Sequence, residues 1–376
     1  MMLSMRKKRV FSFRHQAMAT FFEVMVAGED EDYSRSAARA FFREIDRLEG
    51  FLSRFDPGSE TSRINRLKPG EILPIGLETF DFLKLSFQLM VETGGAFNIN
   101  FRALKGAEVE SRRPGEKARI IEEKLKLFER ESSAEKTIKP KKESVSRKSS
   151  EKARAEGHKH GEEAAAFEKD SEPGDYPVLL DEKNRENFLS VFPLELVEEN
   201  RGYAAVRLEV AGASLDLDPG AIGKGYALEK ASRIFADWDI SDFLVSAGGS
   251  TVLARGAKPW PVAVGGGFDF FRPGKISLNE RALSGSGHEV KGEHIFDPRR
   301  RAGRSRHLAV WVLHPSAAVA DGLSTALMVM SLDEIRHFAQ KHPEVSALVL
   351  SRSKKSYFFN EMNIYEPGTG NRKKKR

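Results

Sequence analysis

The sequence predicts an α+β fold in which mixed sheets pack against helices, interrupted by a charged insertion. Along the chain, apolar residues change between the alternation typical of strands and the three- and four-residue spacing typical of helices. The predicted strands and helices also follow one another without steady βα alternation, and no internal repeat is evident. This mixture is typical of α+β folds rather than of doubly wound parallel ones.

The composition allows one large hydrophobic core or two ordinary ones. The 376 residues are 40% hydrophobic and 31% charged, with a formal net charge of +6. Much of the basic excess lies in RKKR near the start, in a charged central segment and in the terminal RKKKR, without interleaved aromatic residues. We therefore expect no nucleic acid among the partners. A nucleic-acid-binding scaffold, the alternative, would show an affinity that falls steeply with salt.

The chain contains no cysteine, which excludes disulfides, thiolate metal sites and a catalytic cysteine. No apolar run approaches the length of a membrane span, so no membrane span is expected. The first residues, MMLSMRKKRVFSF, lack the apolar stretch typical of a secretion signal. A cytoplasmic location is the resulting expectation.

The first part of the predicted domain, residues 1–101, contains a strand and two long helices. Residues 18–28 alternate and are rich in β-branched and aromatic residues, which predicts a strand. Residues 33–55 and 76–93 carry apolar side chains at helical spacing, and a Gly-Gly pair ends the second helix. A turn containing Asp-Pro-Gly follows the first helix.

A change in composition separates residues 102–175 from the rest. Lys, Arg, Glu and Ser dominate there, and large apolar residues nearly vanish after Phe128. Because little apolar surface remains to offset chain entropy, we predict a disordered low-complexity insertion. The second part of the domain then covers residues 176–366, and residues 367–376 form a basic tail.

The second part is predicted to contain most of the strands. Two of them are joined by Gly248-Gly249, and a further pair of strands closes the chain near residues 345–360. Residues 316–343 are predicted to run from a loop into one long helix.

The segment LDLDPGAIGKGYALEKA, residues 215–231, is predicted to be a strand end, a glycine loop and a helix start. Its three loop glycines would let the backbone approach a bulky ligand, and the helix N-terminus offers unpaired N–H groups. Lys224 adds a cation. A phosphate or pyrophosphate would suit this loop, although glycines required only for a tight turn are the alternative.

A cluster of oxygen-bearing side chains lies in ADGLSTAL. The spacing of Asp321, Ser324 and Thr325 puts their oxygens on one side of a helix. Such donors suit Mg²⁺, which accepts a few protein ligands while phosphates and water supply the rest. The alternative is an ordinary helix N-terminus capped by Asp321 or Ser324.

Several blocks together resemble the ApbE family of FAD:protein FMN transferases. They span nearly the whole chain except the charged insertion, and in order they are MATFFEV, SRFDPGSETSRIN, TGGAFNIN, LDLDPGAIGKGYALEKA, LVSAGGSTVLARG, LSGSG, HIFDPRRRAG and ADGLSTALMVM. The resemblance implies an ApbE-like fold and an Mg²⁺-dependent enzyme that cleaves the FAD diphosphate. FMN would pass through a phosphoester bond to a threonine of an acceptor flavoprotein, with release of AMP.

The resemblance also implies roles for individual residues. The FAD-binding positions would be Met18, Phe55, Asp56, Pro57, Ala96, Phe97, Asn98, Asp218, Lys224 and Phe296. The metal ligands would be the carbonyl of Ala221 and the side chains of Asp321, Ser324 and Thr325. Asp321 and Lys224 would be the catalytic residues: Mg²⁺ held by Asp321, together with Lys224, would neutralise charge that develops on phosphate oxygens. Asp321 is also a candidate to accept the threonine proton, with His294 as the second candidate.

The sequence departs from the family pattern at two positions and in one loop, where NFRALKG and the charged insertion replace the family's apolar continuation. Asn98 stands where the family usually has Asp, and Leu283 stands where Thr is common before Ser-Gly. Two other functions therefore stay open. One is a flavin-binding module without catalysis. The other is a metal-dependent FAD pyrophosphatase, in which water replaces the threonine at the same metal site.

Overall fold

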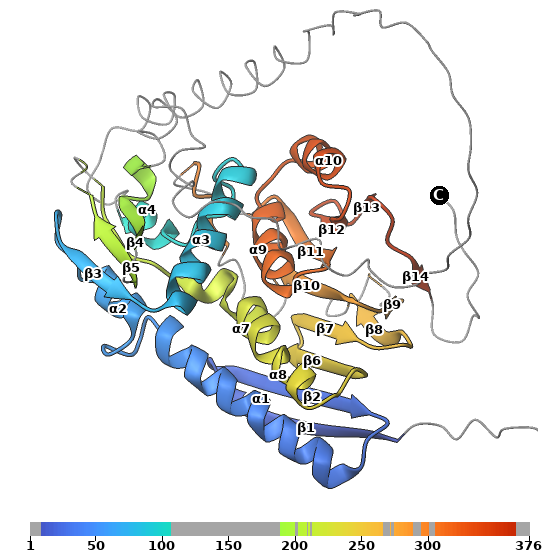
Figure 1. Ribbon diagram of the computed structural model, residues 1–376. Coiled ribbons are helices and arrows are strands. Elements are labelled where there is room, and N and C mark those ends of the chain that lie inside the picture. Colours follow the sequence, from blue (N-terminus) through green and yellow to red (C-terminus); the bar gives the residue numbers. More distant parts are fainter. Residues whose placement is uncertain are drawn as a thin grey trace, which may run out of the picture.

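The computed structural model describes residues 9–106, 189–199, 202–208, 210, 213–265, 271, 274–288, 295–300 and 305–365 (Figure 1). Residues 107–175 of the predicted insertion and the predicted basic tail lie outside these described residues. Helices and strands are mixed in the described part, which confirms the predicted α+β class.

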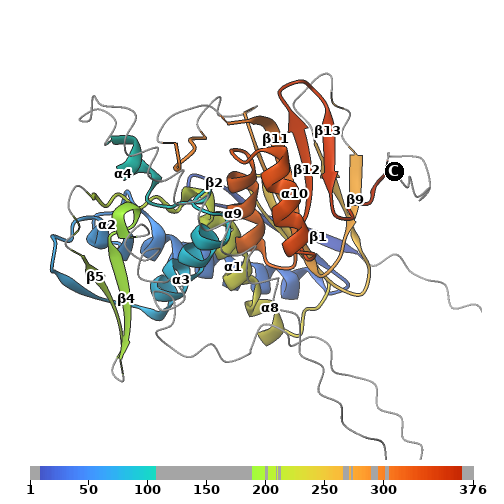
Figure 2. The same cartoon turned by 90° about the horizontal axis from the view of Figure 1, so that it is seen from above.

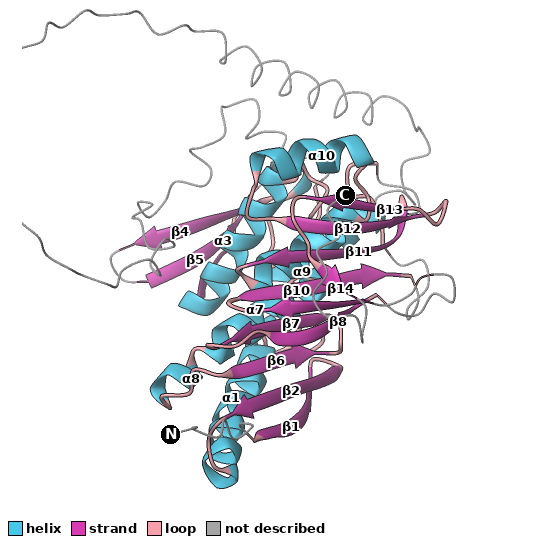
Figure 3. Cartoon of the chain, turned by 90° about the vertical axis from the view of Figure 1, so that its right-hand side faces the viewer, coloured by secondary structure: helices cyan, strands magenta, loops and turns pink. Residues whose placement is uncertain are grey.

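An eight-stranded sheet forms the centre of the fold. Its neighbouring strands are antiparallel, and Figure 3 shows them stacked from β1 to β13. In spatial order they are β1 (Val10–Ala17), β2 (Thr20–Ala27), β6 (Phe243–Ala247), β7 (Thr251–Arg255), β10 (Arg281–Gly287), β11 (His307–His314), β12 (Ser346–Ser351) and β13 (Ser356–Phe359).

Two three-stranded sheets flank this centre. One has the order β3 (Ile72–Ile75), β5 (Gly202–Arg207) and β4 (Leu194–Glu199). The other has the order β14 (Ile364–Tyr365), β9 (Gly274–Leu278) and β8 (Trp260–Val264). The two small sheets lie on opposite sides of the molecule, as both Figure 1 and Figure 2 show.

Several helices cover one face of the large sheet, and the others pack beside them. The described helices are α1 (Glu31–Leu52), α2 (Glu60–Asn65), α3 (Leu77–Glu92), α4 (Phe101–Gly106), α7 (Gly223–Ser232), α8 (Ile234–Asp237), α9 (Ala317–Leu327) and α10 (Leu332–Lys341). Alternate strand residues such as Val24, Val245 and Val310 join these helices in the main core cluster. This cluster draws on the chain both before and after the insertion, so the two parts fold around one core.

The opposite face of the large sheet packs on the small sheet that contains β8 and β9. Leu244, Leu283 and Leu348 point to this side and form a second apolar cluster with Val264 and Ile276. Successive side chains of a central strand therefore point alternately into the two apolar clusters, as expected for strands buried on both faces.

The predicted strand at residues 18–28 is present as β2, but a strand in front of it was not predicted. Val10–Ala17 pairs with β2 through a two-residue turn at Met18 and Ala19. Both turn residues have positive φ angles, 47° and 56°. Glycine or asparagine usually occupies such turns, so this hairpin carries backbone strain.

The predicted strand end at Leu217 is wrong, because residues 213–218 are extended but join no sheet. Two asparagine side chains replace a neighbouring strand. The amide of Asn65 accepts from the N–H of Leu217 at 2.7 Å and donates to its carbonyl at 3.1 Å. Asn100 accepts from Asp216 N–H at 2.7 Å and donates to the Ser214 carbonyl at 2.9 Å. The backbone groups are thus satisfied without a ladder.

The single long helix predicted over residues 316–343 is divided into α9 and α10. Ser331 and Glu334 form a capping box that starts α10 anew. In the part of the chain that the structure describes, no helix is both long and apolar enough to cross a membrane.

Candidate active site

The close approach of α7 and α9 defines the candidate active site. Gly225 lies where the helices meet, and a Cβ added there would be 2.2 Å from the carbonyl oxygen of Ala317 and 2.7 Å from Cβ of Asp321. Glycine is therefore required at this position because no side chain fits between the helices.

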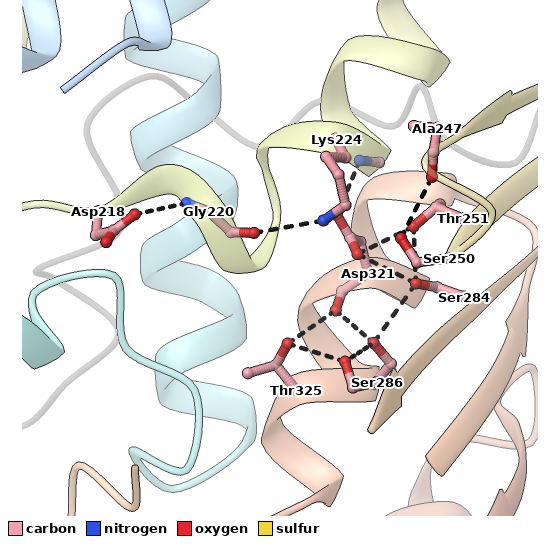
Figure 4. A network of polar contacts seen from close by, with 12 residues as sticks. Asp218, Gly220, Lys224, Ala247, Ser250, Thr251, Ser284, Ser286, Asp321 and Thr325 are labelled. Atoms are coloured by element: carbon pink, nitrogen blue, oxygen red, sulfur yellow. Dashed lines mark hydrogen bonds and ion pairs between the residues drawn. The ribbon is translucent and has the colours of Figure 1, made fainter. Parts of the chain in front are cut away.

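The carboxylate of Asp321 receives four hydrogen-bond donors (Figure 4). Its Oδ2 accepts from Gly225 N–H at 3.0 Å and lies 3.4 Å from Lys224 Nζ. Its Oδ1 accepts from the hydroxyls of Thr251 and Ser284, each at 3.1 Å. The side chain of Asp321 is only 5% exposed, whereas that of Lys224 is 25% exposed. A fixed buried anion thus faces a cation that reaches the surface.

Hydroxyl groups continue from Asp321 toward the surface. Ser324 Oγ donates to the carbonyl of Asp321 at 2.9 Å and lies 2.8 Å from Ser286 Oγ. Thr325 Oγ1 is held more loosely, 3.5 Å from the Asp321 carbonyl and 3.4 Å from Ser286 Oγ. Of the two hydroxyls predicted to bind metal, that of Thr325 is therefore the freer one.

The strands β7 and β10 supply the other hydroxyls. Thr251 lies opposite Ser284 in their antiparallel register, and the two hydroxyl oxygens are 2.9 Å apart. Ser284 and Ser286 are two residues apart on β10, so both side chains point to the face that α9 covers. The helix and the two strands together enclose the carboxylate.

The alternative that Asp321 or Ser324 caps a helix is wrong. Ser316 caps α9, and its Oγ accepts the N–H of Val319 at 3.2 Å. Asp321 is the fifth residue of the helix, and its side chain binds other elements. A buried carboxylate inside a helix needs such partners, because burial without them would cost several kcal/mol.

The other end of the glycine loop contacts a different part of the molecule. Asp218 Oδ1 accepts the N–H of Gly220 at 2.9 Å, which fixes the turn into the short 3-10 helix Pro219–Ala221. Asp218 Oδ2 lies 3.3 Å from Arg54 Nε. The guanidinium of Arg54 in turn stacks over the ring of Phe55, 4.3 Å from its centroid, and that ring is 77% exposed. Asp56 and Pro57 continue this exposed loop.

The loop after α3 lies against the same extended segment. The Ile99 carbonyl accepts the N–H of Asp218 at 2.7 Å, and Asn98 Oδ1 accepts the N–H of Asn100 at 2.7 Å. Ala96 and Phe97 are 3% and 1% exposed, so their side chains fill the core. Any contact of these two residues with a ligand would be made through their backbone.

Three predicted positions remain, namely Met18, Ala221 and Phe296. Met18 is in the β1–β2 turn, and β2 and β6 separate β1 from β7 in the sheet. Ala221 ends the 3-10 helix and is half-buried. Phe296 is half-buried in the described segment 295–300.

That segment is anchored by a buried ion cluster. Arg299 contacts Asp297 at 3.0 Å and Glu334 of α10 at 2.6 Å. Burial opposes the charge of Arg299, but its hydrogen bonds with Asp297 and the charges of Asp297 and Glu334 raise its pKa above the usual value. Asp297 and Arg299 flank Pro298 and hold the backbone on both of its sides. This fixes the backbone next to Phe296.

The side chains of Asp321, Ser324 and Thr325 suit a hard cation that a substrate helps to bind. These three side chains offer only oxygen ligands, and only Asp321 is a carboxylate. Among the described residues, no group of three or more histidine, aspartate or glutamate side chains could hold a metal ion. Mg²⁺ commonly takes one or two carboxylates from the protein and completes its shell with phosphate and water. The residues present fit that pattern.

Sequence reasoning missed Thr251, Ser284 and Gly225 as partners of Asp321. It also missed Ser286 as a partner of Ser324 and Thr325. Ser284 and Gly285 suggest a loop at the end of a strand, but both lie inside β10, and the alternation in Ser284-Gly285-Ser286 is the local signal that could have placed two hydroxyls on one face. The register that places Thr251 opposite Ser284, however, joins residues 33 positions apart. No local pattern encodes this pairing.

The fold and the site define an α+β protein with a glycine loop that leads into a helix and ends at a buried carboxylate. The model of the ApbE family matches residues 18–150 and 174–349. The chain belongs to the ApbE family.

Curated relatives agree with this assignment over part of their length. The chain is 31% identical over 142 residues to an FAD:protein FMN transferase of Klebsiella pneumoniae, a match covering 34% of this chain and 40% of that protein. It is 32% identical over 127 residues to an FAD:protein FMN transferase of Rhodobacter capsulatus, covering 31% of this chain and 24% of that protein. The matches thus span less than half of these relatives.

Solved structures share the fold over nearly the whole chain. The apo flavinyl transferase ApbE of Pseudomonas stutzeri superposes with a TM-score of 0.63 at 18% identity, covering 96% of both chains. The ApbE protein of Thermotoga maritima superposes with a TM-score of 0.60 at 20% identity, covering 94% of this chain and 97% of that one. The predicted ApbE-like fold is therefore confirmed.

Proposed function

We propose that this protein is an Mg²⁺-dependent FAD:protein FMN transferase that attaches FMN to a threonine of an acceptor flavoprotein and releases AMP. Membership of the ApbE family supports the proposal, as do the relatives named for this activity. The observation that carries it furthest is the pairing of Lys224 with Asp321 at 3.4 Å where the glycine loop enters α7. A cation, a buried anion and a helix N-terminus meet at the place where a diphosphate would lie.

The glycine loop suits the diphosphate of FAD. The first turn of α7 has N–H groups without partners inside the helix, and these groups favour anions. Lys224 Nζ also lies 3.4 Å from the carbonyl of Gly220, so the ammonium is held over the loop. These groups would bind the diphosphate and hold its bridging oxygen near the buried carboxylate.

Asp321, Thr325 and the carbonyl of Ala221 would hold the metal ion. When bound, Mg²⁺ supplies positive charge that stabilises the developing charge on phosphate oxygens. Asp321 is suited to this role because the chain has already fixed its position with Thr251 and Ser284. The hydroxyl of Ser324 is bound more tightly, to the Asp321 carbonyl and to Ser286, so Thr325 is the better placed of the two hydroxyls to bind the metal ion.

The reaction would replace the phosphoanhydride bond of FAD by a phosphoester bond to the acceptor. The threonine oxygen of the acceptor forms a bond to the FMN phosphorus, the bond from that phosphorus to the bridging oxygen breaks, that oxygen leaves with AMP, and the threonine proton passes to solvent. Lys224 would stabilise the leaving AMP oxygen. Asp321 already faces one cation, Lys224 at 3.4 Å, so its main role would be to hold cations; His294, the other candidate proton acceptor, lies outside the described residues.

The direct test is incubation of the purified protein with FAD and Mg²⁺, with and without a cytoplasmic extract. AMP release is followed by chromatography, and covalent flavin by fluorescence on denaturing gels. The proposal predicts AMP together with a fluorescent acceptor band, and loss of both after chelation of Mg²⁺. The cytoplasmic location of the acceptor stays a prediction that the extract also tests.

Two outcomes would redirect the assignment. AMP release without a labelled band, even with candidate acceptors added, would identify a metal-dependent FAD pyrophosphatase. Bound FAD without AMP would identify a flavin-binding module that lacks catalysis. If the protein bound no FAD at all, the flavin assignment would be wrong.

A further inference from the structure

The helices α7 and α9 each receive a carboxylate from the other at their N-terminal turns. Asp321 of α9 accepts the N–H of Gly225, the third residue of α7, at 3.0 Å. Glu229 of α7 accepts the N–H of Ala318, the second residue of α9, at 3.2 Å. Glu229 also accepts the hydroxyl of Ser316, the cap of α9, at 2.5 Å. The interaction is thus reciprocal.

Carboxylates at these positions satisfy groups that the helices cannot satisfy internally. The first N–H groups of a helix lack partners within it, and a negative charge beside them is favourable. Gly225 and Glu229 are four residues apart and lie on one face of α7. Two bonds one turn apart fix both the separation and the rotation of a helix pair, whereas one bond would leave rotation free.

A second side of α7 is attached to α3. Tyr226 donates its hydroxyl to the carbonyl of Glu78 at 2.9 Å, and Lys230 pairs with Asp81 at 2.8 Å. Burial and the nearby carboxylates of Asp81 and Glu78 raise the pKa of Tyr226 above its usual range, so the hydroxyl remains a donor. Both contacts are made by the first turns of α3, so α7 is held by α3 as well as by α9.

We propose that Glu229 is a positioning residue: its contact with Ser316 and Ala318 sets how α7 and α9 approach, and so places Lys224 against Asp321. Glu229 follows Lys224 by more than one helical turn, and its carboxylate is bound to the start of α9. Glu229 therefore affects the position of Lys224 only through the packing of α7 against α9. The effect on turnover rests on the proposed function, whereas the effect on the helix contact does not.

The experiment compares Glu229→Ala and Glu229→Gln with a control on the side of the same helix that faces α3. Lys230→Ala removes an ion pair of α7 with α3 but leaves the α9 contact intact. The first measurement is amide hydrogen exchange at Gly225, whose N–H binds Asp321, with Val245 of the buried strand β6 as a reference. It needs neither FAD nor an acceptor.

In Glu229→Ala, exchange at Gly225 should accelerate by about tenfold or more while exchange at Val245 changes little. In Glu229→Gln, the amide oxygen still accepts from Ala318, so exchange should stay close to that of the unaltered protein. If Glu229→Ala fails to fold, Ser316→Ala removes one of the two bonds and should give a smaller acceleration. Unchanged exchange at Gly225 in Glu229→Ala, or in Ser316→Ala if that variant replaces it, would overturn the proposal.

The second measurement separates turnover from binding. A displacement of about 1 Å at a reacting group can cost about a hundredfold in rate, so Glu229→Ala should lower AMP release by about 10- to 100-fold. The affinity for FAD should change by less than about threefold, because the flavin-side loops are not involved. Glu229→Gln should restore most of the rate. Equal rates in Glu229→Ala and Lys230→Ala would also overturn the proposal.

The two measurements keep the two hypotheses apart. If the unaltered protein releases no AMP, the proposed function fails while exchange still decides the role of Glu229. If AMP is released but exchange at Gly225 ignores Glu229, the function stands and the positioning role is wrong.

Discussion

The two ends of the glycine loop differ in burial and in what holds them. At the Lys224 end, Asp321 is almost fully buried and bound by four donors from α7, β7 and β10. At the Asp218 end, the partners are Arg54, which is partly exposed, and the largely exposed ring of Phe55. One loop thus joins a fixed interior site to an open surface.

This difference indicates a division of labour. Fixed, buried polar groups lower a reaction barrier because they need no rearrangement as charge develops. An exposed aromatic ring on a loop can adapt to a ligand and contributes mostly to binding. We expect changes at the Lys224 end to affect stability and turnover, and changes at the Asp218 end to affect affinity.

The largest effect is expected for Gly225→Ala. The added Cβ would overlap the Ala317 carbonyl at 2.2 Å, so α7 and α9 must separate and the N–H bond to Asp321 must stretch. Overpacking of this kind should lower the free energy of unfolding by about 3 kcal/mol and abolish AMP release. Urea unfolding measures the first effect and the FAD assay the second.

Gly50→Ala is the matched control, because a Cβ at Gly50 in α1 meets nothing within 4 Å. It should raise the free energy of unfolding by about 0.5–1 kcal/mol, since glycine is unfavourable inside a helix. A Gly225→Ala protein as stable and active as the Gly50→Ala protein would contradict the tight helix contact.

Lys224→Ala should have the next largest effect, and mainly on turnover. Asp321 keeps its bonds to Gly225, Thr251 and Ser284, so the fold should persist. The loss of a cation beside the leaving oxygen should lower AMP release by about 10²- to 10³-fold. Rates at saturating FAD, compared with FAD affinity by fluorescence quenching, separate the two roles. A loss confined to affinity would place Lys224 in binding alone.

Phe55→Ala should weaken FAD binding by about tenfold, because a stacking contact is typically worth about 1–3 kcal/mol. The ring is 77% exposed, so the free energy of unfolding should change by less than about 0.5 kcal/mol. Phe358→Ala removes another exposed phenylalanine, on edge strand β13, and serves as the control. Equal FAD affinities in the two variants would exclude Phe55 from the flavin site.

The smallest expected effect is a loss of folding stability at low pH. His314 is buried at the end of β11, and its Nδ1 accepts the N–H of Ser316 at the start of α9. Burial and the charge of Arg281 lower the pKa of His314. The hydrogen bond with the Ser316 backbone and the carboxylates of Glu344 and Glu229 raise this pKa by less, so the net shift is downward. The unfolded chain therefore binds this proton more readily than the folded one, and stability is lost as the pH falls below about 6.5.

Thermal unfolding between pH 7.5 and 5 checks this expectation. His314→Asn should show a shallower decline in Tm, because asparagine can accept the same N–H without titrating. His307 is also buried with a lowered pKa, caused first by burial, but it binds the carbonyl of Met330 at the far end of β11. If only His307→Asn flattened the decline, the start of α9 would not be the acid-sensitive point.

Local sequence signals predicted the elements whose patterns are self-contained. The apolar spacing that indicated α1 and α3 and the alternation that indicated β2 each lie within one segment. The same holds for Lys224 and Asp321, since the glycine loop and the ADGLST spacing are local. The division between α9 and α10 could also have been predicted, because the capping pair Ser331 and Glu334 is visible in SLDE.

Other features depend on contacts between distant segments. Asn65 and Asn100 replace a strand beside residues 214–217 across more than 100 residues of chain, and no periodicity indicates such a substitution. The donors Thr251 and Ser284 reach Asp321 only through the register of β7 and β10. The reciprocal contact of Glu229 with α9 is likewise a property of the packed helices.

The most direct test of this division is a comparison of FAD affinity and AMP release in Asp321→Ala. Equilibrium binding of FAD gives the affinity, and a single-turnover reaction with Mg²⁺ gives the rate. Because the buried carboxylate is at the fixed end of the loop, the rate should fall by about a thousandfold while the affinity falls by less than about tenfold. An equal loss in both quantities would place Asp321 in binding alone and contradict the account.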